Sequence, residues 1–144
     1  TDAAISVWGP GRVGVHIAPR GDSHSMGDSD PLATFTYLAR EFAKRHIAFI
    51  CAREHAGENR IGPQIKAAFG GVYIANEKFT RETAEAALAA GEADAVAWGQ
   101  LFIANPDLPR RMKLGAAFNA PNPATFYGGS VEGYTDYPAL AELV

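Results

Sequence analysis

Several side chains that could take part in chemistry stand within or directly after two short apolar runs. His16 lies in the first run, 12–18, and Cys51 lies in the second, followed by Arg53 and Glu54. A guanidinium binds carboxylate or phosphate groups, so Arg53 and Glu54 contact either a substrate or each other. Taken alone, His16 is interpreted as a satisfied core histidine. Cys51 is interpreted as a small buried apolar residue, reactive only where its surroundings lower its pKa.

Polar loops follow the apolar runs and carry the other candidates. His24 and Met26 fall in the loop 19–30, and His55 falls in the loop 53–60. The two histidines either line the mouth of a pocket or are simply solvated. The segment around Met26 is either a mobile lid or a long connection.

The composition excludes several classes of site and partner. Cys51 is the only cysteine, which excludes an internal disulfide framework, a zinc cluster of thiolates and an iron–sulfur site, and favours a cytoplasmic location. We expect no metal site. Lys and Arg number 13 against 16 Asp and Glu, a net charge of −3, which disfavours nucleic-acid and anionic-membrane partners. No apolar run approaches the roughly 20 residues of a membrane helix.

Four apolar runs, each followed by a helical pattern, predict repeated strand–helix units in one domain over 1–144. The runs cover 12–18, 47–52, 72–75 and 93–98. Helices are predicted after Asp30-Pro31, over 61–69 before Gly70-Gly71, from Thr80 to Gly91, and from Asn105-Pro106-Asp107 to Gly115. Residues 121–140 are expected to form an ordered tail with little regular structure, against which Tyr134 and Tyr137 pack.

Two architectures fit four such units. A parallel sheet must be covered on both faces, and strands with one apolar face and one small, polar face are typical of a (β/α)₈ barrel. Such a barrel takes about 250 residues, so this chain supplies half of one and needs a partner. The alternative is an open four-stranded α/β sheet. Both architectures place a ligand at the loops 19–30, 53–60, 75–79 and 99–106.

Three ordered motifs resemble the Old Yellow Enzyme family of flavin-dependent ene-reductases over essentially the whole chain. These motifs are Val7-Trp8-Gly9 with 12–19, the run 99–108, and Phe126-Tyr127-Gly128 with 133–138. The resemblance implies a TIM-type (β/α)₈ barrel that binds FMN, of which this chain supplies strands five to eight. It also implies reduction by NADPH or NADH and reoxidation by activated alkenes such as enones and maleimides, or by nitro compounds.

The same resemblance assigns the candidate site. Backbone N–H groups after strands seven and eight would bind the FMN phosphate, aromatic residues of the tail would flank the flavin, and Tyr127 would also contact the substrate. The cofactor-binding residues it implies are His16, Ala75, Asn76, Trp98, Gly99, Gln100, Phe126 and Tyr127. Many members carry arginine where this chain has His16 and Gln100, so the affinity for FMN is expected to differ from theirs.

The family's substrate-binding pair and its tyrosine proton donor belong to the first half of the barrel, so no catalytic residue is assigned here. We expect the chain to be one part of a split, cleaved or permuted enzyme, active only with a complementary N-terminal half. The alternative is a non-catalytic half-barrel that self-associates and binds a phosphorylated ligand. A dienoyl-CoA-type reductase is disfavoured, because that relative is expected to carry a cysteine cluster.

Overall fold

The computed structural model describes residues 1–20, 27–55 and 57–141. They form two compact units, 1–97 and 98–144, which are treated separately below. The predictions for His24 and Met26 lie outside the described residues. The assignment of 1–144 to a single half-barrel domain stays a prediction.

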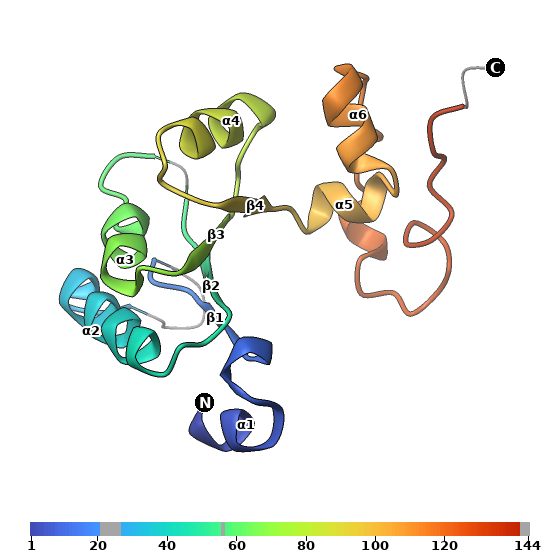
Figure 1. Ribbon diagram of the computed structural model, residues 1–144. Helices are drawn as coiled ribbons and strands as arrows, with labels where there is room; N and C mark the ends of the chain where they lie inside the picture. Colours follow the sequence, from blue (N-terminus) through green and yellow to red (C-terminus); the bar gives the residue numbers. More distant parts are fainter. Residues whose placement is uncertain (21–26, 56, 142–144) are drawn as a thin grey trace. The chain divides into compact units, whose positions relative to one another are not determined.

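The first unit is built around a four-stranded parallel sheet in which the strands follow their order along the chain (Figure 1). Its strands are β1 (Gly14–Ile17), β2 (Phe49–Arg53), β3 (Val72–Asn76) and β4 (Ala95–Ala97). Its main helices are α2 (Pro31–Lys44), α3 (Gly62–Phe69) and α4 (Arg81–Ala89), one between each pair of successive strands. The predicted repetition of strand–helix units is therefore confirmed.

Local signals begin and end these helices as predicted. The Asp30 carboxylate accepts a hydrogen bond from Ala33 N at the start of α2, 3.0 Å away. At the start of α4, Thr80 and Thr83 form a reciprocal capping box. Gly70 ends α3 in the left-handed conformation, with φ 68°, which glycine adopts without a steric penalty.

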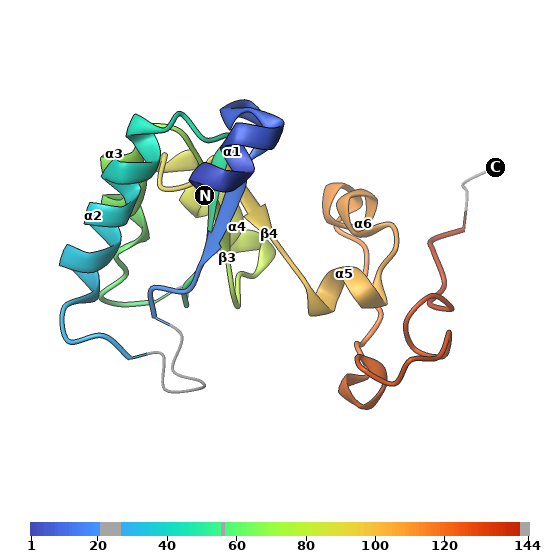
Figure 2. The same ribbon diagram turned by 90° about the horizontal axis from the view of Figure 1, so that it is seen from below.

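The helices cover one face of the sheet and leave the other face uncovered within this unit (Figures 1 and 2). On the covered face Ile50, Ala52 and Tyr73 are each at most 2% exposed, because side chains alternate between faces along a strand. We call the other face the open face. Its side chains, given by the strand register, are His16, Phe49, Cys51, Arg53, Val72, Ile74, Asn76, Ala95 and Ala97, with Gly14 at the edge strand.

A helix that the sequence analysis did not predict precedes the sheet. α1 covers Asp2–Trp8 and is followed by a 3-10 turn, η1, over Pro10–Arg12. The side chain of Thr1 at the start of α1 accepts no capping hydrogen bond. The carboxylate of Asp2 instead pairs with Arg45 after α2, Nε to Oδ1 2.6 Å.

The second unit holds α5 (Gln100–Ala104), α6 (Leu108–Leu114), a 3-10 turn η2 (Pro123–Thr125) and an otherwise irregular tail. The predicted loop 99–106 is wrong over most of its length, because α5 occupies it. The side chain of Asn105 is fully buried and caps this helix by donating to Leu101 O, 2.9 Å away. α6 follows Asp107 and ends at Gly115, as predicted.

Candidate functional site

His16 lies on the open face of β1, with Cys51 as its neighbour in the register of β2. Its side chain is exposed. The interpretation of His16 as a core histidine is therefore wrong, because the strand alternation turns it away from the helices. The assignment of His16 to a flavin site stays a prediction.

Ala75 and Asn76 end β3 and lie on opposite faces of the sheet. Ala75 is 8% exposed on the helix-covered face, so its methyl group is buried while its backbone groups stand at the end of the strand. Asn76 lies on the open face, and its Nδ2 donates to Ala97 O over 2.7 Å. Because Asn76 and Ala97 are register partners, this bond ties together the carboxyl ends of β3 and β4.

Two consecutive residues with left-handed backbone follow β3. The φ angles are 97° at Glu77 and 54° at Lys78, values that residues other than glycine adopt uncommonly. Backbone strain of this kind clusters at ligand-binding sites and switch regions. Both residues belong to the predicted ligand loop 75–79, but their positive φ was not predicted, because neither is glycine, the residue that usually marks it.

The carboxylate of Glu77 forms an ion pair with Arg53 at the carboxyl end of β2. Arg53 donates from both Nε and Nη2, the latter 3.3 Å from Oε1. The guanidinium of Arg53 holds the pKa of the Glu77 carboxyl below its usual value, with smaller contributions from His55 and Lys78. Glu77 is therefore ionised at neutral pH, and Arg53 balances its charge.

Glu54 has a different role from either alternative that the sequence left open. It is 5% exposed, and its two carboxylate oxygens accept hydrogen bonds from Ile61 N and Gly62 N, both over 2.8 Å. A carboxylate here binds the free N–H groups at the start of α3 and complements the helix dipole. The alternative in which Arg53 and Glu54 contact each other is wrong, because Arg53 binds Glu77 and the Glu54 carboxylate binds backbone N–H groups of α3.

Cys51 is half-buried on the open face, rather than fully buried as predicted. Burial raises the pKa of its thiol. The thiol is therefore protonated at neutral pH, which agrees with its interpretation as an unreactive group, since the thiolate is the nucleophile.

The other predicted residues belong to the second unit. Trp98 is half-buried, Gly99 is exposed, and Gln100 is the first residue of α5. Phe126 is half-buried after η2, whereas the side chain of Tyr127 is 99% exposed. Each unit thus carries part of the predicted cofactor-binding set.

The described residues contain neither a metal-ligand cluster nor a membrane-spanning helix. Among its residues, no three His, Cys, Asp or Glu side chains are grouped so that they could hold a metal ion. Within the same residues, no helix is both long enough and apolar enough to cross a membrane.

The chain is similar in sequence to curated reductases. No family model matches. Putative 12-oxophytodienoate reductase 12 of Oryza sativa subsp. japonica is 39% identical over 96% of this chain and 38% of its own length. 12-oxophytodienoate reductase 2 of Arabidopsis thaliana is 38% identical over 96% of this chain and 40% of its own length.

Solved structures agree with these sequence matches. Morphinone reductase in complex with tetrahydroNAD is 43% identical with a TM-score of 0.89, covering 97% of this chain and 39% of the other. The old yellow enzyme homologue from Zymomonas mobilis is 36% identical with a TM-score of 0.92, over 97% and 42%.

These neighbours are TIM-type barrels, so the four-stranded parallel sheet is part of such a barrel, as predicted. The chain spans about two fifths of the length of the relatives that it matches. Within that span, it belongs to the Old Yellow Enzyme family.

Proposed function

We propose that this chain is the second half of an FMN-dependent NAD(P)H ene-reductase, which reduces activated C=C bonds when a complementary N-terminal half completes the barrel. The names of two relatives, 12-oxophytodienoate reductase and morphinone reductase, indicate substrates that carry a keto group. The solved complex of morphinone reductase with tetrahydroNAD supports a nicotinamide as the reductant.

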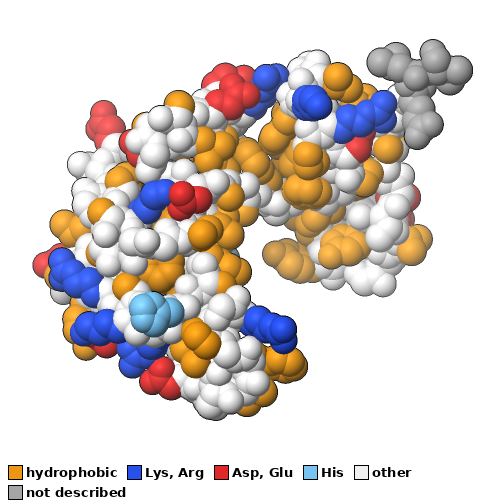
Figure 3. All heavy atoms as spheres, in the orientation of Figure 1, with side chains coloured by type: hydrophobic (Ala, Val, Ile, Leu, Met, Phe, Trp, Pro, Cys, Tyr) orange, Lys and Arg blue, Asp and Glu red, His pale blue; other side chains and the backbone are white. Residues whose placement is uncertain are grey.

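The open face of the sheet is the observation that carries this proposal. Phe49 is 37% exposed and Val72 is 48% exposed on it, and apolar side chains are visible on the surface of both units (Figure 3). Burying apolar surface gains about 25 cal/mol per Å², so an uncovered face of this kind favours association. About three fifths of the length of these relatives lies outside the matched region, and we propose that the corresponding part covers the open face.

β1 and β4 are also the two edges of the four-stranded sheet. An unpaired edge presents free N–H and C=O groups to another chain. Closing a barrel pairs both edges, which is the second reason to expect a complementary half.

The residues at the carboxyl end of β3 fit the phosphate of FMN. The one carboxylate in the loop, that of Glu77, is balanced by Arg53 and does not leave an unpaired negative charge beside an anion. Lys78 adds a positive charge next to it. Gln100 begins α5 and can donate an amide hydrogen bond, where a family arginine would donate two.

Bound FMN would supply the redox chemistry, which is hydride transfer between NAD(P)H and the alkene. Asn76, through its tie to Ala97 O, fixes the strand end from which backbone groups hold the phosphate. We assign the imidazole of His16, which is exposed on the open face, as a hydrogen-bond donor to the flavin. Tyr127 and Phe126 form an aromatic wall for the flavin and the substrate. We assign the proton donor to the complementary half.

Native mass spectrometry of the protein purified from its source tests this proposal. We expect a complex of this chain, or of a longer chain that contains it, with one FMN, and that complex should oxidise NADPH or NADH in the presence of cyclohexenone. A homodimer without flavin would contradict the proposal and support the self-associating half-barrel that binds a phosphorylated ligand.

A defined complementary half makes the assay independent of the source. The matched segment of morphinone reductase, which is 41% identical, is exchanged for this chain in the full-length enzyme. We expect the chimera to retain FMN and cyclohexenone reduction. A chimera that folds but carries no flavin would contradict the assignment of the phosphate site to this chain.

A further inference from the structure

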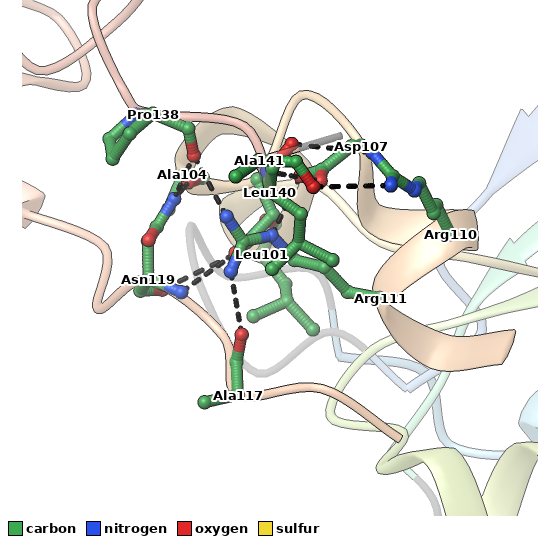
Figure 4. Close-up of polar contacts among 11 residues, drawn as sticks. Leu101, Ala104, Asp107, Arg110, Arg111, Ala117, Asn119, Pro138, Leu140 and Ala141 are labelled. Atoms are coloured by element: carbon green, nitrogen blue, oxygen red, sulfur yellow. Dashed lines mark hydrogen bonds and ion pairs between the residues drawn. The ribbon is translucent and has the colours of Figure 1, made fainter. Parts of the chain in front are cut away.

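The tail segment 119–138, which we call the tail loop, is closed at its base on a single carbonyl oxygen. Pro138 O accepts one hydrogen bond from Asn119 Nδ2 over 2.9 Å and another from Arg111 Nη2 over 2.8 Å (Figure 4). Asn119 begins the loop and Pro138 ends it. The two ends are therefore fixed to each other and to α6.

Arg111 is the centre of this anchor. It is 5% exposed, and its three nitrogens donate in three directions. Nε binds Asp107 over 2.6 Å, Nη1 binds Ala117 O over 2.6 Å, and Nη2 binds Pro138 O. A planar guanidinium can donate in these three directions at once, whereas a lysine amine is a single point charge on a flexible stem. A buried charge is tolerated because each of the three nitrogens has a partner and one partner is the Asp107 carboxylate.

Asn119 anchors the same end of the loop to α5. Its backbone N–H donates to Asn105 Oδ1 over 2.7 Å, and its Nδ2 also donates to Ala104 O over 2.8 Å. Asn105 is fully buried. The start of the loop is thus held by the buried amide of Asn105, while Arg111 binds the carbonyl groups of Ala117 and Pro138.

Further hydrogen bonds cross the inside of the loop. Asn122 N donates to Tyr137 Oη over 2.8 Å, and Thr125 Oγ1 donates to Gly133 O over 3.1 Å. These bonds hold the residues on both sides of the tip, where Phe126 and Tyr127 lie. Tyr137 was expected only to pack against the tail, and its hydroxyl in fact closes the loop.

These hydrogen bonds do not serve to pack the tip of the loop, because the side chain of Tyr127 is 99% exposed. Fixing a loop costs about 1–2 kcal/mol of backbone entropy per residue, and here the fixed segment presents a ring that is buried by nothing in the described chain. A ring held in place before it meets its ligand lowers the cost of binding.

We propose that Arg111 and Asn119 are positioning residues, which hold the tail loop so that Tyr127 meets a planar aromatic ligand. Under the proposed function, on which this inference rests, the ligand is the flavin ring system. Neither positioning residue touches the ligand; both act through Tyr127. All of the hydrogen bonds that carry the inference lie within the second unit.

A double-mutant cycle between Arg111→Lys and Tyr127→Ala tests the inference in the morphinone reductase chimera. FMN affinity is measured by flavin fluorescence, and amide hydrogen exchange is followed across 119–138. We expect each single variant to weaken FMN binding about fivefold or more, and Arg111→Lys to change affinity less than about twofold once Tyr127 is absent. We also expect Arg111→Lys, and not Tyr127→Ala, to speed exchange in the tail loop.

Arg110→Lys is the matched control. Arg110 is the neighbouring arginine on α6, but its guanidinium binds Leu140 O and Ala141 O, beyond the tail loop. It should leave both readouts unchanged.

Four outcomes separate the possibilities. Effects of Arg111→Lys and Tyr127→Ala that add fully would overturn the positioning role and leave a structural one. Unchanged exchange in Arg111→Lys would overturn the anchor itself. If the wild-type chimera binds no FMN, the proposed function and the flavin as ligand are contradicted. If the wild-type chimera binds FMN and Arg111→Lys does not weaken that binding, only the positioning role is contradicted.

Discussion

The ring of Phe49 lies against the backbone of Gly14 on the open face of the sheet. The two residues are register partners on β1 and β2, and a Cβ added at Gly14 would overlap the ring. The glycine therefore makes room for a neighbouring side chain, and no special backbone angle is involved. Gly14 and Phe49 are the first residues of β1 and β2, so this pair lies at the amino-terminal end of both strands.

Replacing Gly14 with Ala should affect assembly more than folding. Phe49 is 37% exposed in this chain, so its ring can turn aside, and the free energy of unfolding should change by less than about 1 kcal/mol. In a completed barrel the ring is enclosed, and overpacking should weaken association of the two halves by about 1–3 kcal/mol. Urea unfolding of this chain and titration with the complementary half measure the two effects.

Gly11→Ala provides the control for that comparison, because a Cβ at Gly11 meets nothing within 4 Å. It should change neither quantity. Equal losses in the chain alone and in the assembled protein for Gly14→Ala would contradict the enclosure of Phe49 by a second half.

Removing the Glu54 carboxylate should destabilise the first unit. Glu54→Ala leaves Ile61 N and Gly62 N without their acceptor and should cost about 2–4 kcal/mol of unfolding free energy. Glu54→Gln keeps one acceptor oxygen and should cost about half as much. Urea denaturation gives both values. The exposed Glu58→Ala is the control and should stay within about 0.5 kcal/mol of wild type; a similar small loss for Glu54→Ala would refute the cap.

The sequence predicted the elements whose signals are local. Asp30, Thr80 and Gly70 stand within the helix end that they cap, so residue type and spacing identified α2, α3 and α4. The parallel order of the strands followed from the repetition of such units. Family motifs then gave the barrel, since four strands alone are also compatible with an open sheet.

The features that were missed depend on contacts between distant parts of the chain. Glu54 caps a helix from the end of the preceding strand, seven residues before Ile61, outside the spacing of a usual N-cap. α5 ends on the buried Asn105, whose partner Asn119 lies 14 residues further on. Glu77 takes a positive φ without being glycine. No local pattern encodes these arrangements.

The stability of the first unit should depend on pH through Asp94. Lys66 Nζ lies 2.6 Å from its carboxylate and Tyr73 N donates to it over 2.8 Å; Lys66 first, then Tyr73, lowers the pKa of Asp94 below its ordinary value of 3.8. Because the pKa of Asp94 is lower in the folded state than in the unfolded state, the interactions of its carboxylate stabilise the fold fully at pH values above the unfolded-state pKa. This stabilisation is lost as the pH falls through the lower folded-state value.

Asp94→Asn should therefore flatten the acid side of the stability profile. The amide still accepts from Tyr73 N, so the fold is kept, but the urea midpoint should fall less between about pH 6 and about pH 3 than in wild type. Lys66→Met should flatten the profile in the same way, and the double variant should add little. A steeper acid loss in Asp94→Asn than in wild type would contradict the sign of the pKa shift.

A negative charge at Asn76 should distinguish a phosphate site from a site for the flavin ring. Asn76→Asp places a carboxylate at the end of β3, opposite Ala97 O, in place of the amide that donates to it. Like charges repel strongly at short range in a partly buried site, so FMN affinity in the chimera should fall about tenfold or more. Riboflavin has the same ring and no phosphate, and its weaker binding should change much less.

Asn59→Asp adds the same charge at an exposed position and serves as the matched control, with no expected effect on either ligand. Equal losses for FMN and riboflavin in Asn76→Asp would mean that the substitution disturbs the tie between β3 and β4 rather than the phosphate. Loss of FMN alone would locate the phosphate at the carboxyl end of β3. The flavin ring would then lie toward the open face, on which His16 stands.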